Sequence, residues 1–482
     1  MTHAAQAWAA LRSRHFTSPA PRGIMEARRR AWRPQKKGRS AVFTNRSLRR
    51  LILPLIAEQL LTMLVGMADT MMISYAGEAA ISGVALVDMV SNLVITLLTS
   101  LATGGAVIVS QYLGGREQSG ADEAASQLHG IALLVSAGLT ALCLLLHGGI
   151  LRLFFGAVEG DVMRAADTYF LVTALSFPFL GIYNASAALY RSMERTRTTM
   201  LVSLLMNAIN VVGNAIGIFV LRAGVMGVAV PTLISRAVAG VLMFRLALRR
   251  ENAVRVRPGR MFARNGAMAR RILRIAVPSS VENGLFTLGR VLVTSIVAMF
   301  GTSQIAANGV AQSVDMLAIV IVNAMNLAVI TVVGQCVGAR AYDEAERLLK
   351  KLMGVSYAAT GALTLLIFLL LPAILNLFSL SEETWHLSYQ LIMAHNLMAT
   401  ALHPTAFNLA NGLRAAGDAR YTMFVGIGSM LLFRLGTAAL LGAGLGLGVY
   451  GVWAAMGMDW LGRSVAFVLR FRSGKWRARR AI

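Results

Sequence analysis

The chain has 482 residues, of which 56% are hydrophobic and only 14% are charged. Soluble domains carry about 25% charged residues, so this chain has too little polar surface for a water-soluble globule. Its 46 Lys and Arg against 22 Asp and Glu give a net charge of +24, which in a soluble protein would indicate a nucleic-acid binder. Here the basic residues cluster between apolar runs, which is typical of topology signals and of contacts with anionic headgroups. The two cysteines, Cys143 and Cys336, exclude a disulfide framework and a thiolate metal site.

Residues 1–48 are predicted to form a disordered basic leader on the cytoplasmic side. Residues 22–39 read RGIMEARRRAWRPQKKGR and lack the apolar segment of a secretory signal peptide. Met25, within this stretch, is an alternative start of the chain.

Twelve apolar stretches follow the leader. Each has roughly 20 or more residues, which is enough to cross a hydrocarbon core of about 30 Å at 1.5 Å per residue. Lipid offers no hydrogen-bond partners to the backbone, so these stretches must be helices. We therefore expect an all-α membrane protein with twelve transmembrane helices. The stretches are residues 51–75, 84–110, 128–150, 169–190, 200–221, 225–246, 275–300, 310–334, 352–377, 387–413, 422–441 and 447–467.

Most basic residues outside the apolar stretches fall in every second connection. By the positive-inside rule, this asymmetry predicts a multi-pass protein of the cell inner (plasma) membrane with both termini in the cytoplasm. The predicted units are the leader 1–48, an N-terminal six-helix lobe 49–248, a cytoplasmic linker 249–274, a C-terminal six-helix lobe 275–471 and a basic cytoplasmic tail 472–482.

An internal repeat with an offset of 224 residues relates the two halves. It pairs Pro54 with Pro278 and Glu58 with Glu282. Each repeat holds an even number of helices, so both halves start on the same side of the membrane and are parallel repeats. Such repeats suit rocking of two bundles about a central cavity. Further matches are Gly77/Gly301, Gln111/Gln335, Gly114/Gly338, Arg116/Arg340 and, after a slip of one residue, Arg191/Arg414 and Thr199/Thr422.

Asp69 is the leading functional residue. An ionisable group inside a bilayer costs about 2.5–3.5 kcal/mol on insertion scales, so each one is a functional hypothesis. Asp69 lies in GMADTMMIS, within the first apolar stretch, where it can carry a proton, or Na⁺ when ionised. Neutral oxygens for the cation are predicted from Asn184, Asn210 and Asn214, the last two being four residues apart and so on one helix face. The structural alternative is that these polar groups only hold helices together.

Glu58 and Glu282 each follow a proline by four residues at equivalent repeat positions. One reading is contact with substrate or proton; the other is a carboxylate that bonds backbone groups freed by the proline kink. Arg290 lies about two turns after Glu282 on the same helix face, which favours the first reading for Glu282. Arg290 is itself a candidate for contact with substrate or proton.

Five further polar residues are predicted to have structural roles. Asp88 and Asp315 fall in matching VDM tripeptides, and placement near helix N-termini would explain both. Asp459 and Arg463 are four residues apart and are predicted to pair with one another. No other metal-ligating residue lies at ligand spacing from His395 in the sequence, so ordinary packing is predicted for this side chain.

Motifs for ATP use and for catalysis are absent. The sequence has no GxxxxGK[ST] phosphate loop and no HExxH or GxSxG motif. We therefore predict that the protein is not an enzyme and has no cofactor beyond transported H⁺ or Na⁺. No metal site is predicted beyond Na⁺ at Asp69.

Five segments resemble the multidrug and toxic compound extrusion (MATE) family, over about residues 49–476. This resemblance implies twelve helices in two lobes and Na⁺- or H⁺-coupled antiport of amphiphilic, often cationic compounds. By motif position Asp69 matches the family's cation-coupling aspartate, and Asn210 and Asn214 match its fifth-helix site. Asn214 departs from the aspartate common there and removes one charge. The segments are LPLIAEQLLTMLVGMADTMMIS, SQYLGGRE, GQCVGARAYDEAER, NGLRAAGDAR and VWAAMGMDWLGRSVAFVLRFRSGKW.

The function predicted from the sequence and this resemblance is therefore secondary active antiport that exports small amphiphilic, often cationic, compounds in exchange for H⁺ or Na⁺. The alternative is a flippase for a lipid-linked or polyprenyl precursor. The expected partners are small-molecule substrates and membrane lipids, without nucleic acid, and the expected state is a monomer.

Overall fold

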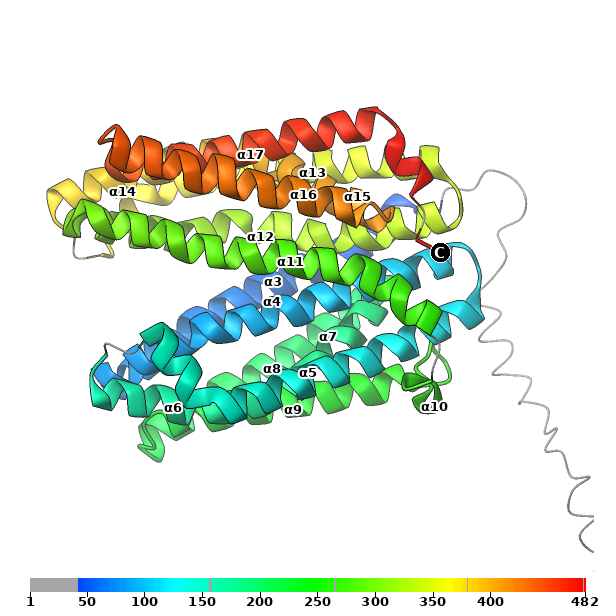
Figure 1. Ribbon diagram of the computed structural model, residues 1–482, viewed down its shortest axis with the longest axis horizontal. Coiled ribbons are helices and arrows are strands. Elements are labelled where there is room, and N and C mark those ends of the chain that lie inside the picture. The colour runs from blue at the N-terminus through cyan, green and yellow to red at the C-terminus, as the bar shows by residue number, and fades with distance from the viewer. Residues whose placement is uncertain (1–41, 156–157, 264–265, 379, 480) are drawn as a thin grey trace, which may run out of the picture.

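The computed structural model describes residues 42–155, 158–263, 266–378, 380–479 and 481–482. Two helical bundles lie one above the other, with α3 to α9 in the lower bundle and α11 to α17 in the upper (Figure 1). The lower, N-terminal lobe contains α3 (Asn45–Ser74), α4 (Glu78–Gly114), α5 (Gln118–Phe155), α6 (Gly160–Leu175), α7 (Phe177–Ser192), α8 (Thr196–Ala215), η1 (Ile216–Val220) and α9 (Met226–Ala247).

The upper, C-terminal lobe follows a short connection that contains α10 (Pro258–Met261). Several of its helices continue through π-helical turns, which insert an extra residue into the helical repeat. Its elements are α11 (Gly266–Val297), η2 (Ala298–Phe300), α12 (Thr302–Gly338), α13 (Tyr342–Leu375), α14 (Glu382–His403), η3 (Pro404–Leu409), α15 (Ala410–Ala415), α16 (Ala419–Ser429), η4 (Met430–Gly436), η5 (Ala439–Gly444), α17 (Gly448–Arg472) and η6 (Lys475–Ala478).

The predicted fold class is confirmed. Among the described residues, nine helical stretches are long and apolar enough to cross a membrane. A tenth is the pair α6 and α7, bent by 46° where α7 begins with Pro178 in its first turn. With the bent pair α6–α7, the N-terminal lobe has six long helical stretches. The continuous stretch α14–η3–α15 and helix α17 complete six in the C-terminal lobe, as the repeat predicted.

Among the described residues, the two lobes share an apolar core at one end. That core joins residues of both lobes, such as Leu51 and Ile108 with Val332 and Leu413. At the other end each lobe packs around its own core. Burial of apolar surface therefore holds the lobes together at the end where the basic connections lie, while the opposite ends are packed independently.

The line of contact between the two lobes at the shared end, called the seam below, repeats the internal symmetry. The Gln111 side chain donates to the Ala415 carbonyl at 2.8 Å, and the Gln335 side chain donates to the Ser192 carbonyl at 2.9 Å. Because Gln111 and Gln335 are repeat equivalents, one contact across the seam is built twice.

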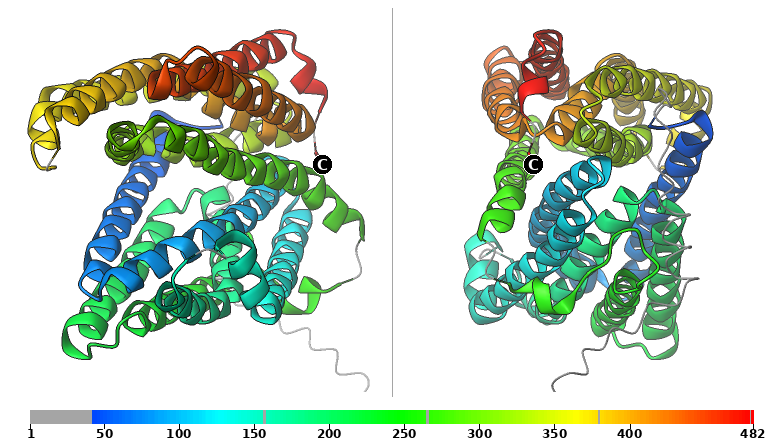
Figure 2. Two further views of the ribbon diagram at one scale, coloured as in Figure 1. Left: turned by 60° about the vertical axis from the view of Figure 1, so that its left-hand side comes forward. Right: turned by 90° about the vertical axis from the view of Figure 1, so that its right-hand side faces the viewer.

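The first described residues contact the C-terminal lobe, which corrects the predicted leader. Residues 42–48 are structured: Phe43 is buried, α3 starts at Asn45, and the Val42 amide donates to Glu344 of α13 at 2.6 Å. Figure 2 shows the blue start of α3 beside the upper bundle. Residues 1–41 of the predicted leader lie outside the described residues.

The predicted linker 249–274 is also shorter than expected. Its last nine residues, 266–274, belong to α11. The remaining connection packs on the N-terminal lobe, where Arg257 pairs with Asp122 at 2.8 Å. The predicted tail is basic but anchored, because Trp476 is buried in the shared core.

Candidate functional site

The N-terminal lobe encloses a cavity of about 400 Å³ lined by α3, α4, α6, α8 and α9. Asp69 of α3 lines it and is half-buried. The Asn214 amide donates to the Asp69 carboxylate at 2.8 Å. The α8 helix brings Asn210 to the same carboxylate, since residues four apart share a helix face.

The Asn210 amide satisfies its neighbours with its nitrogen towards Asp69. In this orientation the nitrogen lies 3.0 and 2.9 Å from the two carboxylate oxygens, and the amide oxygen accepts from the Thr232 hydroxyl at 3.1 Å. The reverse orientation would set an amide oxygen against a carboxylate, which repel one another. Asp69 is thus held by two neutral amides, with Thr232 behind them.

Two more charged side chains line this cavity, Asp88 and Arg236. Asp88 lies about three turns into α4 (Glu78–Gly114), so the predicted placement near a helix N-terminus is wrong. Arg236 of α9 donates to the Ser176 hydroxyl at 2.9 Å. With Asp69 and Asp88 against Arg236, the cavity carries net negative charge.

Asn184 does not join this group. It belongs to α7 and lines a much smaller cavity, of about 30 Å³, between the lobes. Leu327 and Thr331 of α12 line the other side of that cavity. A third cavity, of about 310 Å³, lies within the C-terminal lobe, so the expected central cavity is here divided between the two bundles.

Glu58 and Glu282 form equivalent ion pairs. Glu58 bonds Arg191 at 2.6 Å and Glu282 bonds Arg414 at 2.6 Å. Both carboxylates are nearly fully buried, and neither is among the described residues that line the three cavities. Their partners are arginine side chains, not the backbone groups near the proline. This geometry favours a structural role for both and gives no support to contact with substrate or proton.

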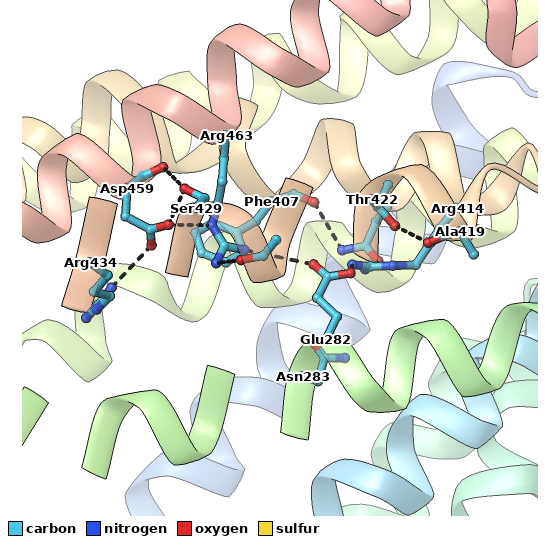
Figure 3. A network of polar contacts seen from close by, with 12 residues as sticks. Glu282, Asn283, Phe407, Arg414, Ala419, Thr422, Ser429, Arg434, Asp459 and Arg463 are labelled. Carbon is cyan, nitrogen blue, oxygen red and sulfur yellow. Dashed lines mark hydrogen bonds and ion pairs between the residues drawn. The ribbon is translucent and has the colours of Figure 1, made fainter. Parts of the chain in front are cut away.

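Glu282 also belongs to a buried charged cluster, drawn in Figure 3. Asp459 pairs with Arg463 at 2.8 Å, as predicted from their spacing, and with Arg434 at 3.6 Å. Arg463 in turn lies 3.9 Å from Glu282. The cluster ties α11 to η4 and α17.

Arg290 is separate from Glu282. It lines a cavity of about 310 Å³ in the C-terminal lobe, together with Asp315, His395 and Arg434. Asp315 lies within α12 and pairs with His395 of α14 at 2.5 Å. The prediction of a helix-terminal role for Asp315 is wrong, because Asp315 lies well inside α12. His395 packs against Trp453 and Trp460, as predicted, and it also pairs with Asp315 and lines this cavity.

The family comparison reflects the internal repeat. A family model described as MatE matches residues 54–216 and again residues 278–440. The two matches are offset by 224 residues, the offset of the repeat, and together they cover most of the chain. The chain belongs to the MatE family. The predicted resemblance is thereby confirmed.

Similar proteins extend over nearly the whole chain. It is 29% identical to an uncharacterized transporter, YisQ, of Bacillus subtilis over 89% of this chain and 94% of that protein. It is 26% identical to a probable multidrug resistance protein NorM of Thermotoga maritima over 91% and 94%. These relatives, with the MatE match, identify a multi-pass membrane transporter of a multidrug efflux family and do not favour the flippase alternative.

Solved structures support the fold. A transporter of the MOP superfamily from Pyrococcus furiosus superposes with a TM-score of 0.82 at 23% identity, over 89% of this chain and 95% of that one. A MATE structure in complex with MaL6 gives 0.83 at 22% identity, over 95% and 98%. The MatE lobes of this chain therefore have the architecture of solved MATE transporters.

Proposed function

We propose that this MatE protein exports small amphiphilic compounds in exchange for H⁺ or Na⁺, and that Asp69 carries the coupling cation. The observation that supports this most strongly is the setting of its carboxylate. In the part of the chain that the structure describes, Asp69 has no ion-pair partner and is contacted by the neutral amides of Asn210 and Asn214. A carboxylate in such a place gains a counter-charge when it takes up a cation.

The neighbouring atoms suit either cation. The Asn214 side-chain oxygen is buried and has no hydrogen-bond partner among the described residues. It can accept a hydrogen bond from a protonated carboxyl, or it can coordinate Na⁺ beside the carboxylate oxygens. Glu58 and Glu282 lack this capacity because arginines already neutralise them.

The energy available is sufficient for export. One elementary charge that moves through 100 mV releases about 2.3 kcal/mol, which supports roughly fiftyfold accumulation. Coupling requires that Asp69 exchange its cation on opposite sides of the membrane. Two lobes joined at one end and packed separately at the other can provide such access by rocking.

The test is efflux from proteoliposomes driven by a pH jump or by a Na⁺ gradient. Asp69→Asn keeps the size and hydrogen bonding of the side chain and removes its charge, so gradient-driven transport is expected to fall to background. Asp161→Asn, the same change at an exposed site, should leave transport intact. The gradient that drives the unsubstituted protein identifies the coupling ion. Undiminished gradient-driven transport by Asp69→Asn would remove Asp69 from this role.

We also propose that the shared end of the lobes faces the cytoplasm, since the basic connections gather there. Arg420 is exposed at that end, and Asp161 is exposed at the start of α6, in the independently packed part of the N-terminal lobe. An impermeant maleimide added to intact cells should label Asp161→Cys and spare Arg420→Cys until the cells are lysed. Labelling of the second variant alone in intact cells would reverse the orientation.

A further inference from the structure

The cavity of the C-terminal lobe has no part in the cation step proposed above, yet it is built like a binding site. It measures about 310 Å³ and is lined by α11, α12, α14, η3, η4 and α17. Pockets of roughly this size and upward, with apolar walls and a few convergent polar groups, are typical of small-molecule sites.

Two arginines give this cavity its charge. Arg290 lines it from α11 and has no carboxylate within ion-pair distance in the described residues. Arg434 lines it from η4 and is only 8% exposed. Its Nε atom makes no hydrogen bond to any residue that the structure describes, and one Nη atom faces the weakly accepting sulfur of Met456 at 3.1 Å.

The nearby carboxylates offset these charges only in part. One carboxylate, Asp315, lines the cavity with the two arginines, and it also pairs with His395. Asp459, 3.6 Å from Arg434, bonds Arg463 at 2.8 Å and the Ser429 hydroxyl at 2.5 Å. Figure 3 shows Arg434 at the edge of this cluster, with one dashed contact to Asp459. Two arginines against one carboxylate give the lining of this cavity a positive formal charge, whereas two carboxylates against one arginine line the cavity around Asp69.

Aromatic side chains form one wall of the cavity, next to the two arginines. His395 meets Trp453 and Trp460 edge to face, each at 5.2 Å between ring centres, and His403 meets Trp460 at 4.8 Å. Phe286 lies under the Arg434 guanidinium at 5.5 Å. The indole N–H of Trp460 is buried without an acceptor among the described residues. The wall thus combines flat apolar faces with an unused hydrogen-bond donor.

We propose that this cavity binds an aromatic organic anion, with its carboxylate at Arg290 and Arg434 and its ring against the wall of Trp453, Trp460 and Phe286. The Arg434 Nε and the Trp460 indole N–H are buried without partners among the described residues, which costs free energy that an anionic acceptor recovers. A cation would meet two arginines and, among the lining carboxylates, Asp315 alone. The proposal rests on the proposed function, because it assigns the exported compound to one lobe and the coupling cation to the other.

The test is binding to the full chain in lipid nanodiscs, measured by titration calorimetry with empty nanodiscs as background. The probes are 2-naphthoate, its neutral amide 2-naphthamide and the cation 2-naphthylmethylammonium, which share one ring system. We expect the acid to bind at least about tenfold more tightly than the amide, as a charge-assisted arginine contact provides, and the cation to bind most weakly.

Arg290→Gln is the decisive variant, because Arg290 has no ion pair whose loss would disturb folding. It should remove most of the preference for the acid over the amide. Arg152→Gln removes one exposed charge from α5 in the other lobe and should leave that preference unchanged. If the cation binds as tightly as the acid, or if Arg290→Gln keeps the full preference, the proposal is wrong.

Asp69→Asn separates this inference from the proposed function. If that variant binds 2-naphthoate normally and loses gradient-driven transport, both proposals stand. If no anion preference is found while a gradient still drives efflux through Asp69, the anion site fails alone. If 2-naphthoate binds through Arg290 but Asp69→Asn transports as before, the coupling role fails alone.

Discussion

Replacement of Glu282 by glutamine is expected to destabilise the C-terminal lobe by about 3–5 kcal/mol, because it leaves buried arginine charge without its counter-charge. Glu282 is 5% exposed and bonds Arg414 at 2.6 Å, with Arg463 at 3.9 Å. The cluster holds Arg414, Arg434 and Arg463 against two carboxylates, Glu282 and Asp459. Without Glu282 its three arginines would face Asp459 alone.

Thermal unfolding of the purified protein can be followed by reaction of a thiol dye with Cys143 and Cys336, since both are buried and become reactive on unfolding. Glu346→Gln is the matched control. Glu346 also meets two cations, Lys350 at 2.7 Å and Arg477 at 2.6 Å, but it lies at the water-exposed end of α13. Its loss should cost at most about 1 kcal/mol.

A second substitution tests the pairing itself. Arg414→Gln in the Glu282→Gln background removes the orphaned charge and should recover part of the lost stability, since both partners are then neutral. If Glu282→Gln unfolds at the temperature of the unsubstituted protein and yet abolishes transport, the ion pair is not structural. Contact of Glu282 with substrate or proton would then be the better reading.

The duplicated ion pairs show what the repeat could predict. An offset of 224 residues placed Glu58 and Glu282 at equivalent positions, and a slip of one residue did the same for Arg191 and Arg414. The structure joins each glutamate to its arginine at 2.6 Å. Repeat equivalence thus related the two glutamates to one another and the two arginines to one another. It did not predict that a glutamate pairs with an arginine, because more than 130 residues separate the partners.

Helix periodicity predicted part of the cation site. It placed Asn210 and Asn214 on one face of a helix, and both meet Asp69. Periodicity describes one helix at a time, so it does not say which neighbour that face meets. Asn184 was grouped with them on residue type alone, and its helix instead faces the small cavity between the lobes. Thr232 was missed because a threonine in an apolar helix carries no distinguishing pattern.

The C-terminal cavity was missed for a related reason. Asp315 and His395 are 80 residues apart on different helices and meet only where α12 packs beside α14. Their burial as a pair depends on how the two helices are rotated about their axes. A lone histidine in an apolar run is usually a packing residue, and nothing local to His395 indicated otherwise.

Substitution of both Gly114 and Gly338 by alanine is expected to open the seam between the lobes. A Cβ at Gly114 would lie on the backbone carbonyl of Gln335, and a Cβ at Gly338 would lie on that of Gln111. The obstacle is backbone on both sides, so no side-chain rotation can relieve it. Overpacking in a well-packed region costs about 1–3 kcal/mol per site, and two sites should shift the balance between lobe arrangements at least tenfold.

The overpacking destabilises the arrangement in which α4 and α12 cross closely, because each glycine touches the opposite lobe at this crossing. Transport that needs both arrangements should therefore drop at least tenfold, while each lobe remains folded. Spin labels at Arg197→Cys and Arg420→Cys, both exposed near the seam, should report a longer distance between the lobes.

Gly354→Ala is the control for the seam. A Cβ there meets nothing within 4 Å, and alanine in a helix is about 0.5–1 kcal/mol more favourable than glycine. This variant should transport normally and keep the label distance. If the double variant at Gly114 and Gly338 also kept both, the close approach of α4 to α12 would not be needed in the cycle, and rocking about this seam would be wrong.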